Sequence, residues 1–445
     1  MRFPLLLRGV LVAAVAVAIL VPIKLIEGKV GERRARAEGV LQQFASETSG
    51  PQVIAGPFLA IACEETYSHE REIKRDGKEE TIAEKKVRAC PTTYVAPRTL
   101  KVTGTMPVEE RHRGIYPIRL YRAKLAITGE VAWPDPPRTD GTTTRSYRHA
   151  QLVTLVSDPR GIRELRASPA VVEGRAGPVD PRFAVRSDLG DYAPARAGEV
   201  VAFDISLELV GTSSIGMVPV GDATRIQLSS NWPHPSFGSA WSPDERRIGP
   251  DGFEASWRVS RHATGGQAAW EKEAREGRLA NPGAAAGVAL FDPVNVYALS
   301  YRATEYGFLF VLFTFAALAL CEVIARVRVH PMQYLLVGSA IAVFFLLLMA
   351  GSEHVPFGAA YAASAVACVS LLTFYLRHPL GSARRAGAFL GLFSAMYGSL
   401  YVLLKSEDHA MLLGSLLVFA LLAVAMVATR KVDWSTVART AKNGV

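Results

Sequence analysis

The chain has 445 residues, of which 49% are hydrophobic, and its formal net charge is +9 at pH 7. This length accommodates a membrane domain together with a separate folded domain. The lysines and arginines do not form a dense tract interleaved with aromatic residues, which argues against nucleic acid as a partner. The four cysteines are too few for a disulfide scaffold.

The N-terminal residues predict a membrane anchor. Arg8 precedes an apolar run from Gly9 to Ile23, and Lys24 follows it. Because long basic side chains can reach the two interfaces, the span is about 20 residues, enough to cross the hydrocarbon core. A cleaved leader is the alternative, but the run is longer than a usual leader core and its small residues lie in its middle. A retained signal anchor over residues 1–27 is therefore favoured.

Residues 28–302 are predicted to form a β-rich domain that begins with a helical stalk over residues 28–48. Apolar and polar residues alternate over Leu100–Met106, Val201–Leu209 and Phe253–Val259. Such alternation indicates an antiparallel sheet with one face packed on a core. Further strands are expected at Gln52–Ile61, Ile115–Val131, Gln151–Ser157 and Thr224–Ser230.

Turn residues separate these short strands, and this spacing predicts a β-sandwich-like domain. Two stretches, His69–Lys86 and Thr264–Gly287, look like loops and are expected to be surface hairpins or short helices. Cys63 and Cys90 lie in this domain. If the domain is periplasmic they could be bridged, but two free thiols are equally compatible, because one pair has no diagnostic spacing.

The last third of the chain predicts a five-span membrane domain over residues 303–434, with a tail at 435–445. A mildly amphipathic segment, Val294–Thr304, precedes it and is expected to lie at the membrane surface. Each apolar run is close to the roughly 20 residues that a spanning helix needs. The runs are Tyr306–Ala325, Met332–Ala350, Phe357–Leu376, Ala386–Leu404 and Ala410–Thr429.

The polar breaks between these runs predict the orientation. Residues 326–330 and 377–385 are basic, whereas residues 352–354 and 405–409 are acidic or mixed. Basic segments stay on the cytoplasmic side. With the anchor, this gives six spans, cytoplasmic N- and C-termini, and a large extracytoplasmic β domain.

The outer breaks supply a candidate polar cluster in the outer leaflet. Carboxylates beside imidazoles could bind a divalent metal or relay protons. Charges also belong at loop ends, and acidic residues are favoured at helix N-termini, so the ordinary structural interpretation is preferred. No histidine spacing typical of a metal site supports a metal. The cluster comprises Glu305, Glu353, His354, Glu407, Asp408 and His409.

Two further patterns in the spans are interpreted as structural. Glu322 and Arg326 are four residues apart and can form an ion pair across one helical turn. Gly387 and Gly391 form a small-xxx-small pattern, extended by Ala395 and Gly398, that permits close helix packing.

Short polar motifs also occur in a fixed order around the spans and in the β domain. They are Gly50-Pro51-Gln52, Asp222–Arg225, Gly249–Phe253, Arg302–Gly307, His330–Gly338, Ser352-Glu353-His354, Ser406–Ala410 and Lys431–Trp434. Together they resemble the CreD family of inner-membrane proteins over most of the chain. The resemblance implies a Gram-negative protein of cell-envelope integrity, often controlled by a two-component system. It brings no catalytic residues, and it says nothing about a Cys63–Cys90 disulfide, where this chain departs from the family.

The sequence gives no sign of catalysis or of a cofactor, because it contains no Walker A, G-x-G-x-x-G or C-x-x-C motif. The first hypothesis is a non-enzymatic inner-membrane protein that supports envelope integrity or stress response. Its periplasmic β domain would bind or sense an envelope component. Beside the lipid bilayer, its partners would be envelope proteins, lipids or peptidoglycan. The alternatives are an ion or small-molecule transporter that uses the bundle, and a membrane enzyme on lipid-linked precursors with the outer carboxylates as acid and base.

Overall fold

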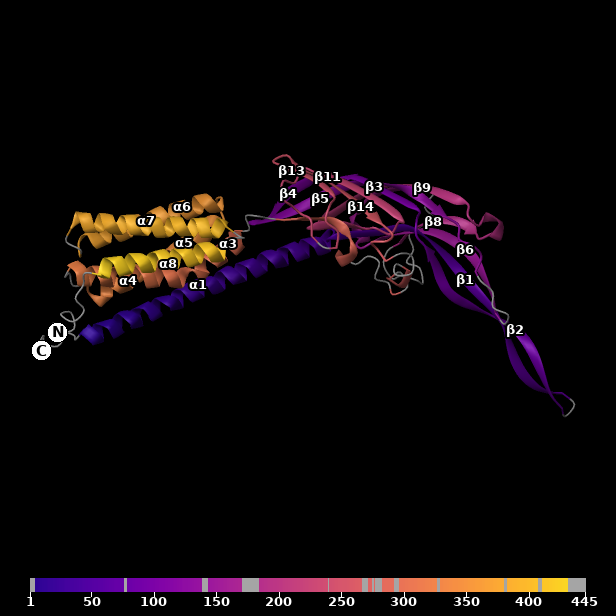
Figure 1. Cartoon of the computed structure of the whole chain (residues 1–445), viewed down its shortest axis with the longest axis horizontal. Coiled ribbons are helices and arrows are strands. Elements are labelled where there is room, and N and C mark those ends of the chain that lie inside the picture. Colours follow the sequence, from indigo (N-terminus) through magenta and orange to yellow (C-terminus); the bar gives the residue numbers. More distant parts are fainter. Residues whose placement is uncertain are drawn as a thin grey trace. The chain divides into compact units, whose positions relative to one another are not determined.

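A computed structural model describes most of the chain and divides it into two compact units (Figure 1). One unit comprises Met1–Gly39 with Val294–Val445, and the other comprises Val40–Pro293. We call them the membrane unit and the β unit, and each is described by itself. The described residues are 5–75, 78–137, 143–169, 184–238, 240–265, 271–273, 276, 282–291, 296–325, 329–379, 382–406 and 410–430.

The membrane unit is helical, and a helix lies at each of the six predicted spans. Among the described residues, four helices are long and apolar enough to cross a membrane: α1, α5, α6 and α7. Helices α3 and α4 meet at a bend of 40° and together could form a fifth span, and α8 contains the apolar stretch Met411–Val424. The helices are α1 (Leu5–Glu47), α3 (Val296–Glu305), α4 (Gly307–Ala325), α5 (Pro331–Ser352), α6 (Phe357–Arg377), α7 (Ala383–Lys405) and α8 (Ala410–Thr429).

Helix α1 contains both the predicted anchor and the predicted stalk in one unbroken run of 43 residues. Its membrane part packs closely on α5, because a Cβ atom on Gly338 would lie 2.6 Å from Ile19. A larger residue at position 338 would therefore push the two helices apart. The last turns of α1, from Val40 onward, belong to the β unit.

Aromatic rings fill the interior of the membrane unit. The Phe344 and Tyr397 ring centroids are 4.6 Å apart, and those of Phe310 and Tyr397 are 5.0 Å apart. These rings meet edge to face, the arrangement that the ring quadrupole favours. Helix α3, expected at the membrane surface, packs on α5 and α7 and buries Tyr297 and Leu299; its position relative to a bilayer stays a prediction.

The expectation that the α7 glycines make close helix contacts was wrong. No described atom lies within 4 Å of a Cβ built on Gly387, Gly391 or Gly398. The reason is that α7 packs through its opposite face, where Phe393 and Leu400 are buried. The small residues therefore lie on an exposed side of the helix.

The β unit consists of two mixed sheets of the described strands. In sheet A the order is β12-β15-β10-β1-β6-β8, with β2 also paired to β1; in sheet B it is β13-β14-β11-β3-β5-β9-β7, with β4 also paired to β5. Sheet A contains β1 (Gln52–Arg75), β2 (Lys78–Val95), β6 (Thr143–Val156), β8 (Ala184–Asp191), β10 (Ser214–Val218), β12 (Pro235–Ser236) and β15 (Ala286–Leu290). Sheet B contains β3 (Thr99–Thr105), β4 (Val108–Arg113), β5 (Tyr116–Ala132), β7 (Ile162–Ser168), β9 (Val200–Thr212), β11 (Ala223–Ser230), β13 (Glu245–Gly249) and β14 (Gly252–Ser260).

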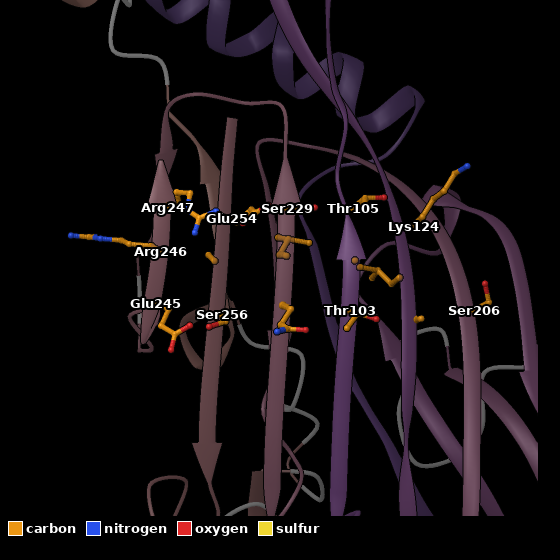
Figure 2. Close-up of a pocket in the computed structure, with 16 residues that line it drawn as sticks. Thr103, Thr105, Lys124, Ser206, Ser229, Glu245, Arg246, Arg247, Glu254 and Ser256 are labelled. Atoms are coloured by element: carbon orange, nitrogen blue, oxygen red, sulfur yellow. Dashed lines mark ion pairs between the residues drawn. The ribbon is translucent and has the colours of Figure 1, made fainter. Parts of the chain in front are cut away.

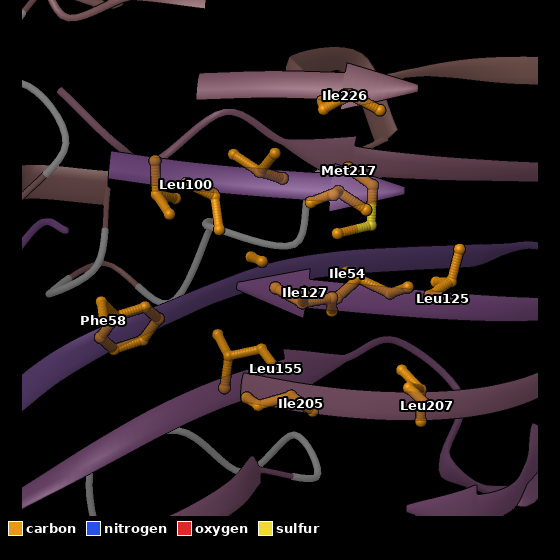
Figure 3. Packing of buried hydrophobic residues seen from close by; sticks show 14 of the residues in the cluster. Ile54, Phe58, Leu100, Leu125, Ile127, Leu155, Ile205, Leu207, Met217 and Ile226 are labelled. Atoms are coloured by element: carbon orange, nitrogen blue, oxygen red, sulfur yellow. The ribbon is translucent and has the colours of Figure 1, made fainter. Parts of the chain in front are cut away.

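One hydrophobic core lies between the two sheets (Figure 3). Ile54 and Leu155 of sheet A and Ile127 and Ile205 of sheet B are all at most 2% exposed. Each such side chain contributes about 1.5–3 kcal/mol relative to exposure in water. The predicted β-sandwich and the apolar faces of Leu100–Met106, Val201–Leu209 and Phe253–Val259 are confirmed.

The antiparallel pairing expected from the alternation holds for most strand pairs but not for all of them. Strands β1 and β10 pair in parallel, and so do β3 and β11. Alternation of apolar and polar residues reports which face of a strand is buried, whereas it carries no information about the direction of the neighbouring strand.

The stretch His69–Lys86, expected to be a surface hairpin or a short helix, has the hairpin form, and its described residues extend the β1–β2 ladder (Figure 1). Among the described residues, β6 pairs with β1 as far as Tyr67, and beyond it β1 and β2 pair with each other as a two-stranded ribbon. Cys63 and Cys90 face one another across this ladder and form a disulfide near the base of the ribbon. Glu65 beside them is 6% exposed and accepts hydrogen bonds from Arg88 and Arg145.

Polar contacts fix the last turn of α1 to the β unit. Arg160 donates a hydrogen bond to the carbonyl of Ser46, one of the carbonyl groups that a helix C-terminus leaves without a partner inside the helix. Asp158 binds Arg160 at 2.7 Å and accepts from the Gly50 backbone N–H at 3.1 Å. The Arg160 hydrogen bond holds the pKa of the Asp158 carboxyl below its ordinary value.

Replacing Asp158 should destabilise the β unit in a pH-dependent way. Because the pKa of this carboxyl is lowered by folding, its stabilisation is present above the ordinary carboxyl pKa of about 4 and is lost as the pH falls. We expect Asp158→Asn to lower the free energy of unfolding by about 1 kcal/mol at pH 7. This difference from the unmodified protein should shrink toward pH 3.5. Thermal unfolding followed by near-ultraviolet circular dichroism measures both. Asp251→Asn in an exposed turn is the control. An equal loss of stability for Asp158→Asn at both pH values would contradict the stabilising role of the Asp158 carboxylate.

Candidate functional site

The polar face of sheet B carries a hollow of about 640 Å³ (Figure 2). The pleat of the strands creates this face, since successive side chains point to opposite sides of a sheet. Leu125 and Leu228 point into the core, whereas Lys124 and Gln227 beside them are exposed. The hollow extends over β3, β5, β9, β11, β13 and β14.

The floor of the hollow is a row of small or neutral side chains in direct register. Strand pairing aligns Ser256 with Gln227, Gln227 with Thr103, Thr103 with Ala126, and Ala126 with Ser206. Because four of the five neighbouring strands place a short side chain in this row, the surface is depressed there. Hydroxyl and amide groups can both donate and accept hydrogen bonds, which suits a ligand that carries hydroxyl groups.

Charged side chains border this floor on both sides (Figure 2). Lys124 lies on β5, while Glu245 and Arg247 lie on the edge strand β13, opposite Ser256 and Glu254 of β14. Arg247 forms an exposed ion pair with Glu254 at 3.6 Å. The rim therefore offers charge for orientation, and the floor offers neutral hydrogen-bonding groups.

Sequence reasoning predicted most of these strands but not this site. A row across five strands depends on the register of each pair and on the parallel pairing of β3 with β11. Both are long-range properties, and alternation within each strand contains no signal for them.

The predicted outer cluster is described only in part, because Glu407, Asp408 and His409 lie outside the described residues. Glu353, whose side chain is 11% exposed, forms an ion pair at 3.6 Å with Arg33 of α1. Glu305 is exposed at the end of α3 and lies within electrostatic range of Lys24, also on α1. His354 is exposed. Of these residues, Glu353 is thus the one whose described contact is with a basic residue of α1.

Within the described parts of the chain, no group of three or more histidine, cysteine, aspartate or glutamate side chains is placed to hold a metal ion. The Arg33–Glu353 pair is a structural contact inside the membrane unit, between α1 and the end of α5. It fastens the helix that contains the anchor to the bundle.

The pair expected between Glu322 and Arg326 cannot be placed, since Arg326 lies outside the described residues. Glu322 instead accepts hydrogen bonds from the Tyr334 hydroxyl at 3.3 Å and from the Val329 backbone N–H at 3.4 Å. These bonds tie the end of α4 to the beginning of α5. Sequence spacing along one helix could not indicate a partner on the next helix.

These observations define a multi-pass membrane protein whose chain also contains a β-sandwich domain. The family model described as inner membrane protein CreD matches residues 4–435. The chain is 30% identical to the inner membrane protein CreD of Escherichia coli (strain K12) over 449 aligned residues. The alignment covers 98% of this chain and 94% of that relative. The chain belongs to the CreD family, as its motifs suggested, and it is an inner-membrane protein of the bacterial envelope.

Breaking the Arg33–Glu353 pair should loosen the membrane unit. Arg33→Gln leaves the largely buried Glu353 carboxylate without its counter-charge. Because Arg33 is itself partly exposed, we expect the free energy of unfolding to fall by on the order of 1–2 kcal/mol. Adding Glu353→Gln should restore part of this free energy. Thermal unfolding in detergent measures the change. Arg34→Gln, which removes an exposed pair with Glu38, is the matched control. Equal midpoints for Arg33→Gln and Arg34→Gln would count against the contact.

Proposed function

We propose that this protein is a non-enzymatic inner-membrane protein that supports envelope integrity or stress response, and that its β unit is a periplasmic domain that binds or senses an envelope component. The hollow on sheet B carries this proposal. Its floor contains Ser256, Gln227, Thr103 and Ser206, which present hydrogen-bonding groups on a face that the core does not use. Envelope proteins, lipids or peptidoglycan are the candidate partners.

Two observations support a periplasmic β unit. Arg377, Arg384 and Arg385 flank the break between α6 and α7, and basic breaks stay in the cytoplasm. The β unit also contains the Cys63–Cys90 disulfide. Disulfides persist in oxidising compartments such as the bacterial periplasm and are rare in the cytosol. Cytoplasmic N- and C-termini follow from the same orientation.

The composition of both units favours binding over transport or catalysis. Phe310, Phe344 and Tyr397 pack edge to face in the interior of the membrane unit, which suits an anchor better than a polar pathway. The serine, threonine, glutamine and alanine side chains of the floor do not titrate near neutral pH, so they suit hydrogen bonding better than acid–base chemistry. The membrane unit then holds the β unit at the bilayer.

Filling the hollow should abolish the protective function in cells. In a strain that lacks the gene, we expect the unmodified chain to restore resistance to envelope stress. Thr103→Trp should fail because the indole ring occupies the floor. Thr144→Trp, at an exposed position of β6 in sheet A, should protect normally. Survival under envelope stress is the measurement, with the amount of protein in the inner membrane determined for each variant. Full protection by Thr103→Trp at normal abundance would refute the role of the hollow.

A further inference from the structure

Three cationic side chains stand side by side on the polar face of sheet B. Strand pairing places Arg225 of β11 directly opposite Lys101 of β3 on one side and Arg258 of β14 on the other. All three residues are exposed. Each is two residues along its strand from the hollow floor, about 7 Å away.

This arrangement is unfavourable within the protein itself. Directly opposite residues on paired strands have Cβ atoms about 4.5–5.5 Å apart, and like charges there are destabilising. Arg258 has acidic neighbours at the sheet edge, Asp244 at 3.8 Å and Glu245 at 3.9 Å.

The other two cations have no such neighbours. Among the described residues, no carboxylate oxygen lies within 4.0 Å of a side-chain nitrogen of Lys101 or Arg225. The row continues from Lys101 to Thr128 and then to Asp204. The acid nearest to Lys101 on this face is Glu130, which lies diagonally across on β5 at about 7–8 Å, and Arg225 has no acidic residue directly or diagonally opposite it on β3 or β14. An anion from outside the chain would neutralise these two cations.

We infer that this face binds an anionic glycan, with its acidic groups on Lys101, Arg225 and Arg258 and its hydroxyl groups over the neutral floor. The inference rests on the proposed function, since it names the ligand class of the same hollow. Guanidinium groups bind carboxylate or phosphate through two parallel hydrogen bonds, and a lysine adds a point charge. Cations about 5 Å apart on neighbouring strands suit a chain that carries repeated acidic groups. Hydroxyl-rich sugar rings fit Thr103, Gln227 and Ser256 beside them.

Binding of two matched sugars to the full chain tests the inference. The protein is placed in nanodiscs of neutral lipid and titrated, by calorimetry, with a six-unit galacturonate oligomer or with maltohexaose. We expect the galacturonate oligomer to bind at least about tenfold more tightly, because its carboxylates meet the cationic row. Its affinity should fall as salt is added, since exposed charges are screened.

Two variants that each remove two positive charges locate the site. Lys101→Gln with Arg225→Gln should weaken galacturonate binding by about tenfold or more. Lys85→Gln with Lys86→Gln, at exposed positions of β2, should leave it unchanged. The first variant should unfold at the same or a higher temperature than the unmodified protein because it relieves repulsion. Lost binding therefore cannot be attributed to misfolding.

Other outcomes would overturn the inference. Equal affinity for the two sugars would show that charge does not select the ligand, and equal weakening by the two double variants would show that the row is not the site. Binding to phosphatidylglycerol vesicles without binding to the galacturonate oligomer would indicate a lipid surface instead. If no acidic sugar binds but Thr103→Trp still fails in cells, the proposed function stands and only the ligand class is wrong.

Discussion

Burial of one face of each sheet is the constraint on which the β unit depends. The inner faces of sheets A and B share one core, with Ile54 and Leu155 on one side and Ile127 and Ile205 on the other. Since side chains alternate along a strand, this burial determines which residues remain outside. A shift of one residue in any strand of sheet B would move its apolar side chains into water. The core thus holds the polar face in register.

The functional proposal follows from that register. Neutral side chains, four of the five small, align across five strands and leave a hollow, and one row away three cations align across three strands. Neither row stabilises the fold. The neutral row buries little apolar surface, and the positive charges of the cationic row repel one another. Sites of this kind, where a local rule of stability is broken, are expected to be functional. Helix α1 belongs to both units: its last turn is held in the β unit by a hydrogen bond from Arg160, and its Arg33 pairs with Glu353 in the membrane unit.

The helices and strands could be predicted from the sequence better than the pairing and packing between them. Alternation over Phe253–Val259 correctly predicted a strand and its buried face, and the hydrophobic lengths correctly predicted the helices of the membrane unit. The parallel pairing of β3 with β11, and hence the row through Arg225, depends on contacts between distant segments. The same limit applies to Gly387 and Gly391: their spacing indicates a smooth helix face but not whether another helix covers it.

The most direct measurement is the accessibility of Thr103→Cys to a membrane-impermeant maleimide in intact spheroplasts. We expect rapid labelling before lysis, because Thr103 lies on the floor of an open hollow and we propose that the β unit is periplasmic. Ile127→Cys, on the buried face of the neighbouring strand β5, should label only after denaturation. The chain without an added cysteine gives the background. Labelling of Thr103→Cys only after the membrane is broken would contradict the account.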